Sequence, residues 1–260
     1  MQTAPHTFRR PISRTTPAAA LVIGPDGVFR RALASELSSL ASTVRTADSL
    51  LDASDASRPK HAGSSPIDVL LIAEDEVVPE ELEQSLSELR VRLGSPRLVP
   101  ILFGRPPAPE RRAALRRAGA ELALFGRFGR HALRFQVNRA LAPAMPNGMR
   151  GQPRAPMEWR TRMFAAGREK LVRCYSLSPA GGYFVTPRPF VVGAGVALEL
   201  PSSQPTRFVI EGRIVYTHAL GDEAGHNLPG GMAVAFSDLE VGLEQVIRRG
   251  VAMSRNALTI

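Results

Sequence analysis

Two arginines and a serine–glycine element indicate that this chain binds an anion. Arg150 and Arg154 are four positions apart, and Ser176, Ser178 and Gly181 follow in a Ser-x-Ser-x-x-Gly pattern. A guanidinium group presents a planar set of donors that fits phosphate oxygens or the O6 and N7 atoms of guanine, which lysine cannot match. Serine can hydrogen-bond such a ligand, and glycine lets the backbone approach it closely. These residues predict a site for an anionic ligand such as a nucleotide.

Short predicted strands surround these residues in the second half of the chain. The runs are separated by Gly, Pro and Ser turns and lie at 157–163, 171–176, 183–186, 196–200, 208–216 and 232–236. A helix from about Leu239 follows and carries Leu243, Val246 and Ile247 on one face. Six strands with a covering helix are typical of a small antiparallel barrel, closed or half-closed.

Residues 148–240 resemble a PilZ domain, the family of bacterial receptors for cyclic di-GMP. Members bind this ligand through an Arg-x-x-x-Arg element leading into the barrel and an Asp/Asn-x-Ser-x-x-Gly element on the barrel surface. The resemblance implies that cyclic di-GMP binds the residues that match these elements, which are Arg150, Arg154, Ser176, Ser178 and Gly181. It also implies control of motility, polarity or surface polysaccharide through an unidentified protein partner.

Ser176 departs from the family pattern, which has Asp or Asn at this position. The loss of one hydrogen bond costs about 1–3 kcal/mol, or roughly one to two decades of affinity. Two functions therefore stay open. The first is a receptor that binds cyclic di-GMP, and the alternative is a PilZ-scaffold adaptor that binds no nucleotide and acts by protein–protein contact alone.

The first half of the chain alternates between strand and helix patterns. Strands are expected at 20–23, 43–46, 67–72, 98–103 and 121–125, and helices after each of them. Asp26 is expected to cap the first helix, whose apolar face carries Phe29 and Leu33. Five βα units predict a parallel sheet covered on both faces, a flavodoxin-like doubly wound fold.

Residues 19–141 resemble a response-regulator receiver. Receivers hold Mg²⁺ with an acidic pair after the first strand and accept phosphate on an aspartate that ends the third strand. Here the first place reads Gly24-Pro25-Asp26, and the third strand is expected to end at Ala73, just before Glu74 and Asp75. The resemblance thus implies a pseudo-receiver used for docking or dimerisation. A slipped register that makes Asp75 the phosphate acceptor is the alternative.

The length of 260 residues fits two domains rather than one. We expect a disordered leader over 1–17 and a receiver-like domain without its phosphoacceptor over 18–141. A linker that carries the Arg-x-x-x-Arg element is expected over 142–153, and a PilZ-like barrel with a C-terminal helix over 154–260.

The two resemblances imply a non-enzymatic signalling protein, and composition favours a cytoplasmic one. The formal net charge is +9, but Lys60 and Lys170 are the only lysines and the arginines are spread along the chain, which favours solvated helix faces over a nucleic-acid partner. Cys174 is the only cysteine, so a reducing compartment fits. No apolar run approaches the ~20 residues of a membrane span. No metal site, catalytic constellation or cofactor is predicted.

Overall fold

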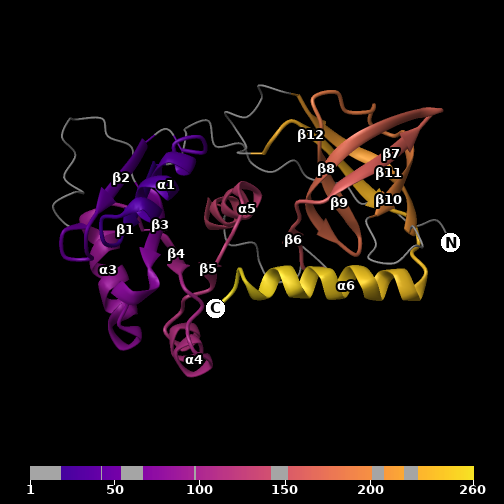
Figure 1. Cartoon of the computed structure of the whole chain (residues 1–260). Helices are drawn as coiled ribbons and strands as arrows, with labels where there is room; N and C mark the ends of the chain where they lie inside the picture. Colours follow the sequence, from indigo (N-terminus) through magenta and orange to yellow (C-terminus); the bar gives the residue numbers. More distant parts are fainter. Residues whose placement is uncertain are drawn as a thin grey trace.

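The computed structural model describes residues 19–41, 43–53, 67–96, 98–141, 152–200, 208–219 and 228–260. The leader predicted over 1–17 and most of the predicted linker, residues 142–151, lie outside these ranges. The described residues form a parallel sheet with helices and an antiparallel barrel with one helix (Figure 1).

The parallel sheet has the strand order β2-β1-β3-β4-β5. Its strands are β1 (Ala19–Ile23), β2 (Thr43–Ala47), β3 (Ile67–Ala73), β4 (Val99–Gly104) and β5 (Leu122–Phe125). All the neighbouring pairs are parallel. This order is that of a flavodoxin-like doubly wound fold, so the predicted fold class is confirmed.

Helices cover both faces of this sheet. They are α1 (Val28–Leu37) and α5 (Arg130–Leu141) on one face, and α3 (Leu82–Arg92) and α4 (Pro109–Arg117) on the other. Two short 3-10 helices, η1 (Glu74–Glu76) and η2 (Pro79–Glu81), follow β3. Because successive side chains of a strand point to opposite faces, Val22 packs in the cluster of α1 and α5, and Leu21 in that of α3 and α4.

The expected helix cap at Asp26 was wrong. The N-cap of α1 is Gly27, with no side-chain cap hydrogen bond, and Asp26 instead forms an ion pair of 3.0 Å with Arg30. Arg30 also donates to the carbonyls of Gly24, at 2.8 Å, and Ala47, at 2.9 Å. A largely buried guanidinium group needs hydrogen-bond acceptors and a negative charge close by. The Asp26 carboxylate therefore pairs with Arg30 and does not cap α1.

The second sheet has the order β6-β8-β7-β10-β11-β12-β9, and a β8–β9 pairing closes all but β6 into a ring. The strands are β6 (Ala155–Pro156), β7 (Arg160–Ala165), β8 (Arg168–Ser178), β9 (Gly181–Val185), β10 (Gly195–Leu200), β11 (Phe208–His218) and β12 (Gly231–Phe236). The predicted antiparallel barrel of six strands is therefore confirmed, and it is closed.

One long helix, α6 (Val241–Asn256), lies along the barrel (Figure 1). Leu243, Ile247 and Val251 recur every four residues and are buried in the barrel core. Val246, which the sequence placed on this face, is 47% exposed. It lies about 100° around the helix from Ile247, outside the narrow apolar stripe. None of the described helices is long and apolar enough to cross a membrane.

The helix α5 lies between the parallel sheet and the barrel (Figure 1). Tyr175 of β8 stacks edge-on against His131, with ring centroids 5.4 Å apart, and against Phe135, at 6.5 Å. Asn138 Nδ2 donates to the Tyr175 hydroxyl at 3.3 Å. Since Tyr175 is buried in this contact, its pKa is raised. The barrel thus packs on the receiver-like unit through a mixed aromatic and polar contact.

We expect this contact to weaken as the pH falls below about 6.5. Partial burial is the main cause that lowers the pKa of His131, and its hydrogen bond to the Met157 carbonyl and the charge of Glu158 oppose this only in part. The unfolded state therefore binds a proton first, so the stability present above the unfolded-state pKa is progressively lost below it. Thermal unfolding from neutral pH to about pH 5 measures this loss. His131→Phe should flatten it, and an unchanged slope would contradict the assignment.

Candidate anion-binding pocket

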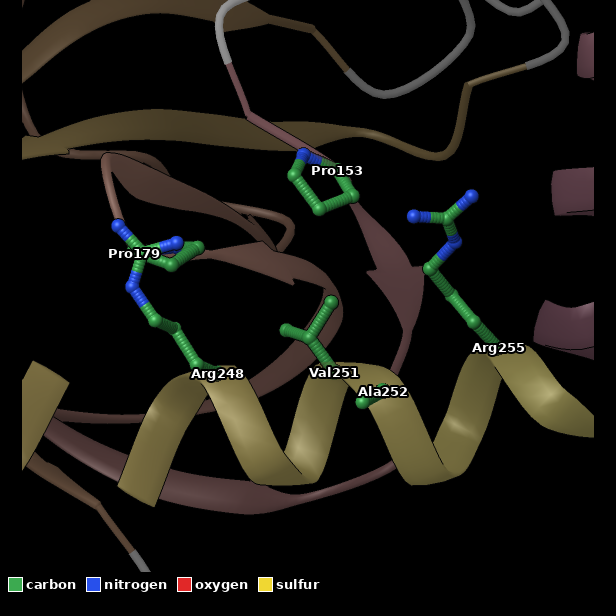
Figure 2. A pocket seen from close by; sticks show the side chains of 6 residues that line it. All are labelled: Pro153, Pro179, Arg248, Val251, Ala252 and Arg255. Carbon is green, nitrogen blue, oxygen red and sulfur yellow. The ribbon is translucent and has the colours of Figure 1, made fainter. Parts of the chain in front are cut away.

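A pocket of about 210 Å³ lies between the barrel and α6 (Figure 2). Its lining residues come from three segments and are Pro153, Pro179, Arg248, Val251, Ala252 and Arg255. Pro153 directly precedes Arg154, and Pro179 lies between Ser178 and Gly181. The two sequence elements that predicted a ligand site therefore border one pocket.

Arg154 is exposed at the start of β6. In β6, Ala155 pairs with Leu177 and Pro156 pairs with Ser176, so the backbone beside Arg154 is held next to the serine element of β8. This pairing explains why two elements that are more than twenty residues apart in sequence border the same pocket. Arg150, the first arginine of the predicted pair, lies outside the described residues.

The serine–glycine element is buried and does not lie open on the barrel surface. Ser176 and Ser178 are both buried in β8, and the Ser178 hydroxyl donates to the carbonyl of Gly181 at 3.1 Å. Gly181 starts β9 under β12, where an added Cβ would lie 2.2 Å from the carbonyl oxygen of Val234. The fold therefore uses Ser178 to close the β8–β9 turn and needs Gly181 for the close approach of two strands.

Two arginines of α6 bring positive charge to the pocket. Figure 2 shows Arg248 and Arg255 rising from the helix on either side of Val251, toward Pro153 and Pro179. Arg248 is also paired with Glu244 one turn earlier, at 3.0 Å from Nε. A pocket bordered by guanidinium groups attracts anions and disfavours cations.

A third arginine, Arg139 of α5, lies within electrostatic reach of Arg255. Burial lowers the pKa of Arg139, the charge of Arg255 lowers it further, and Glu121 opposes this in part. Arg139 also donates to Gln136 Oε1 at 3.1 Å. Two like charges therefore act on each other here, and of the two only Arg255 lines the pocket.

Arg248 and Arg255 were not predicted as pocket residues from the sequence. They follow the Arg-x-x-x-Arg element by about a hundred positions. Because the chain is rich in arginine, their sequence positions suggest only a solvated helix face. One signal was available. Arg248, Val251 and Arg255 are spaced by three and four residues, so the two arginines flank an apolar residue on one side of the helix.

The carboxyl edge of the parallel sheet, where a receiver carries its phosphorylation site, is packed with apolar groups. The strand β3 ends at Ala73, and a Cβ added to Gly24 after β1 would lie 2.8 Å from the Ala73 Cβ. Phe103 lies beside them, and the Phe29 ring stacks on it at 5.7 Å. An acidic residue at the place of Gly24 would collide with β3 unless the backbone moved.

The acidic residues near this edge do not form a receiver-type phosphorylation site, because one is paired with an arginine and another lies beyond the strand end. Glu74 forms an ion pair with Arg111 of α4, whose guanidinium group also donates to the carbonyl of Val77 at 2.7 Å. Asp75 is exposed on η1, beyond the end of β3. Within the described ranges, no group of three His, Cys, Asp or Glu residues could hold a metal ion.

Comparisons with known proteins concern the fold alone. No family model matches the chain, and no curated protein matches it either. The chemotaxis response regulator CheY4 of Vibrio cholerae is 17% identical, with 48% of this chain and 100% of that chain covered and a TM-score of 0.38. A CheY-like receiver domain protein from Methanospirillum hungatei is 15% identical over 48% and 94% of the two chains, with a TM-score of 0.39. The Bacillus subtilis inhibitor of motility MotI/DgrA is 14% identical over 44% and 57%, with a TM-score of 0.34.

Proposed function

We propose that this chain is a non-enzymatic regulatory protein of bacterial signalling that binds cyclic di-GMP at the barrel and relays binding through protein–protein contacts. One observation carries the proposal. Pro153 of the Arg-x-x-x-Arg element and Pro179 of the serine–glycine element border the same pocket, together with Arg248 and Arg255. An anionic guanine nucleotide is the ligand that suits such a concentration of guanidinium groups, because they pair with phosphate oxygens and with guanine O6 and N7.

The size of the pocket limits how the ligand lies. Pockets that enclose small molecules hold about 300–1,000 Å³, and this one holds about 210 Å³. The pocket therefore encloses only part of the dinucleotide, and Arg248 and Arg255 at its border can each reach a phosphodiester group. The remainder lies over the exposed segment at Arg154.

The receiver-like unit supplies the output surface in this proposal. Its carboxyl edge carries packed Phe29, Phe103 and Ala73 in place of a phosphorylation site. In this proposal, a unit whose phosphorylation site is filled by apolar groups acts by docking to a partner. The resemblance of the second domain to PilZ proteins points to motility, polarity or surface polysaccharide as the process that the protein controls.

The adaptor without a nucleotide remains the second candidate, because two of the motif residues have structural roles. Ser178 closes a turn and Gly181 permits strand contact. Both would be present in a barrel that binds no ligand. Ligand binding that depends on Arg154 or on the arginines that border the pocket would therefore decide between the two candidates.

Replacing Arg154 with alanine is expected to weaken cyclic di-GMP binding about 10- to 100-fold, because a charge-assisted hydrogen bond contributes about 1.5–3 kcal/mol. Calorimetric titration of the purified full chain measures this. Arg213→Ala is the matched control, since Arg213 is an exposed arginine on β11, across the ring from β8. Absence of heat with the wild-type chain at millimolar ligand would favour the adaptor. Equal weakening in both variants would show a nonspecific charge effect.

A further inference from the structure

The helix α6 contacts both the pocket and the receiver-like unit. Its second half supplies Arg248, Val251 and Arg255 to the pocket. Beyond Asn256 the chain continues as residues 257–260, which leave the barrel and reach the parallel sheet (Figure 1). A single helix therefore connects the ligand pocket to a different folded unit.

Residues 257–260, here called the C-terminal segment, pair with the edge strand β5. The amide of Ala123 donates to the carbonyl of Leu258 at 3.1 Å, and the amide of Phe125 donates to that of Ala257 at 3.3 Å. Thr259 forms an antiparallel bridge with Leu122. The segment thus extends the sheet at its β5 edge.

Side chains of the receiver-like unit hold this segment in place. Leu258 is buried in the cluster of α1 and α5, and Ile260 is buried in the cluster of α3 and α4. Gln136 of α5 is fully buried, and its Nε2 donates to the Leu258 carbonyl at 2.5 Å. Arg116 of α4 donates to the Ile260 carbonyl at 2.7 Å. The segment is therefore integrated into the core of the receiver-like unit.

The last turn of α6 links the pocket to the seating of this segment. Arg255 lines the pocket and stands one residue before the end of α6. Its carbonyl accepts hydrogen bonds from the amide of Leu258, at 2.8 Å, and from the hydroxyl of Thr259, at 3.1 Å. An anion that holds the Arg255 side chain in the pocket would therefore also stabilise the backbone to which these two residues of the segment are bonded.

We propose, building on the proposed function, that Arg248 and Arg255 bind the anionic groups of the ligand and that this binding is thermodynamically coupled to the seating of the C-terminal segment on β5. The two arginines are seven residues apart, about 10.5 Å along the helix axis. This spacing suits a ligand with two separated phosphodiester groups better than a single phosphate. Cyclic di-GMP should act here, whereas GMP and inorganic pyrophosphate should act weakly.

Hydrogen exchange measured by NMR on the full chain tests the coupling. The amides of Ala123 and Phe125 are the reporters, because both donate to the C-terminal segment. Saturating cyclic di-GMP is expected to slow their exchange about tenfold, an ordinary size for coupling between two sites. Arg255→Gln should abolish the ligand effect, since it removes the charge that holds the anion next to the segment. Arg249→Gln, an exposed neighbour that does not line the pocket, is the control and should behave as wild type.

The outcomes separate this inference from the proposed function. If the wild-type chain binds cyclic di-GMP but the exchange of Ala123 and Phe125 stays constant, the coupling is wrong and the receptor function stands. The coupling is also wrong, and the receptor function stands, if the Arg255→Gln variant binds cyclic di-GMP and shows the same slowing of exchange as the wild-type chain. If the wild-type chain binds neither cyclic di-GMP nor any smaller anion, both the receptor function and the coupling are overturned. Equal slowing by pyrophosphate would show an adventitious anion effect and refute the spacing argument.

Discussion

Replacing Gly181 with alanine is expected to destabilise the barrel by about 3 kcal/mol, at the upper end of the cost of overpacking. The added Cβ would lie 2.2 Å from the carbonyl oxygen of Val234, and the atom it meets belongs to the backbone of β12. A side chain could turn away, but this carbonyl cannot move without disturbing the β9–β12 pairing, in which Gly181 faces Ala235. Urea unfolding measures the loss as a lower midpoint with an unchanged slope.

The matched control for this change is Gly195→Ala at the start of β10. No atom lies within 4 Å of a Cβ added there, so stability should change by less than about 1 kcal/mol. The pair of variants also bears on function. Gly181 belongs to the motif that predicted the ligand site, yet loss of binding in Gly181→Ala would follow from loss of folding. If that variant were as stable as wild type and only ligand binding failed, Gly181 would be a ligand contact and the packing argument would be wrong.

Replacing Gln136 with leucine is expected to release the C-terminal segment and to cost about 2 kcal/mol of stability. The side chain is fully buried, and its Nε2 donates to the carbonyls of Ala123 and Leu258. Leucine has a similar volume but no donor, so two buried acceptors would each lose a hydrogen bond. Each lost hydrogen bond costs about 0.5–1.5 kcal/mol, and the Leu258 carbonyl keeps the amide of Ala123 as a donor.

Limited proteolysis with trypsin, together with urea unfolding, measures this release. The Arg255–Asn256 bond lies at the end of α6, and we expect it to be cleaved faster once the segment is free. Gln245→Leu is the control, because it makes the same substitution at an exposed position of α6 and should change stability by less than about 0.5 kcal/mol. Equal cleavage rates in the Gln136 variant and the wild type would show that other contacts are sufficient to seat the segment.

Much of the fold could be predicted because strands, helices and turns each have a recognisable pattern over a few neighbouring residues. The buried run of β3 and the four-residue spacing of Leu33 and Leu37 in α1 indicated strand and helix without any knowledge of the partners. Turn residues between short runs likewise indicated the barrel. Predictions from local sequence were wrong where a buried partner competed for the same side chain. The Asp26 carboxylate, predicted to cap α1, pairs with the largely buried Arg30 instead.

Only part of the candidate site could be predicted from the sequence. The spacing of Arg154, Ser178 and Gly181 indicated a ligand site, but the burial of both serines depends on the pairing of β8 with β6 and β9. The pocket itself needed α6, whose Arg248 and Arg255 reach it only because Leu243, Ile247 and Val251 pack against the barrel.

By itself, the sequence determined the two fold classes and the arginine and serine–glycine elements, since hydrophobic period and turn chemistry act between near neighbours. Tertiary structure alone decided that α6 completes the pocket and that the C-terminal segment extends β5. Both depend on contacts between residues far apart in sequence, such as Ser254 with Pro156 for α6 and Gln136 with Leu258 for the segment. Nothing in the local pattern of a four-residue segment specifies which sheet edge it will join, because backbone pairing is open to any free edge and the choice depends on side chains brought there by the rest of the chain.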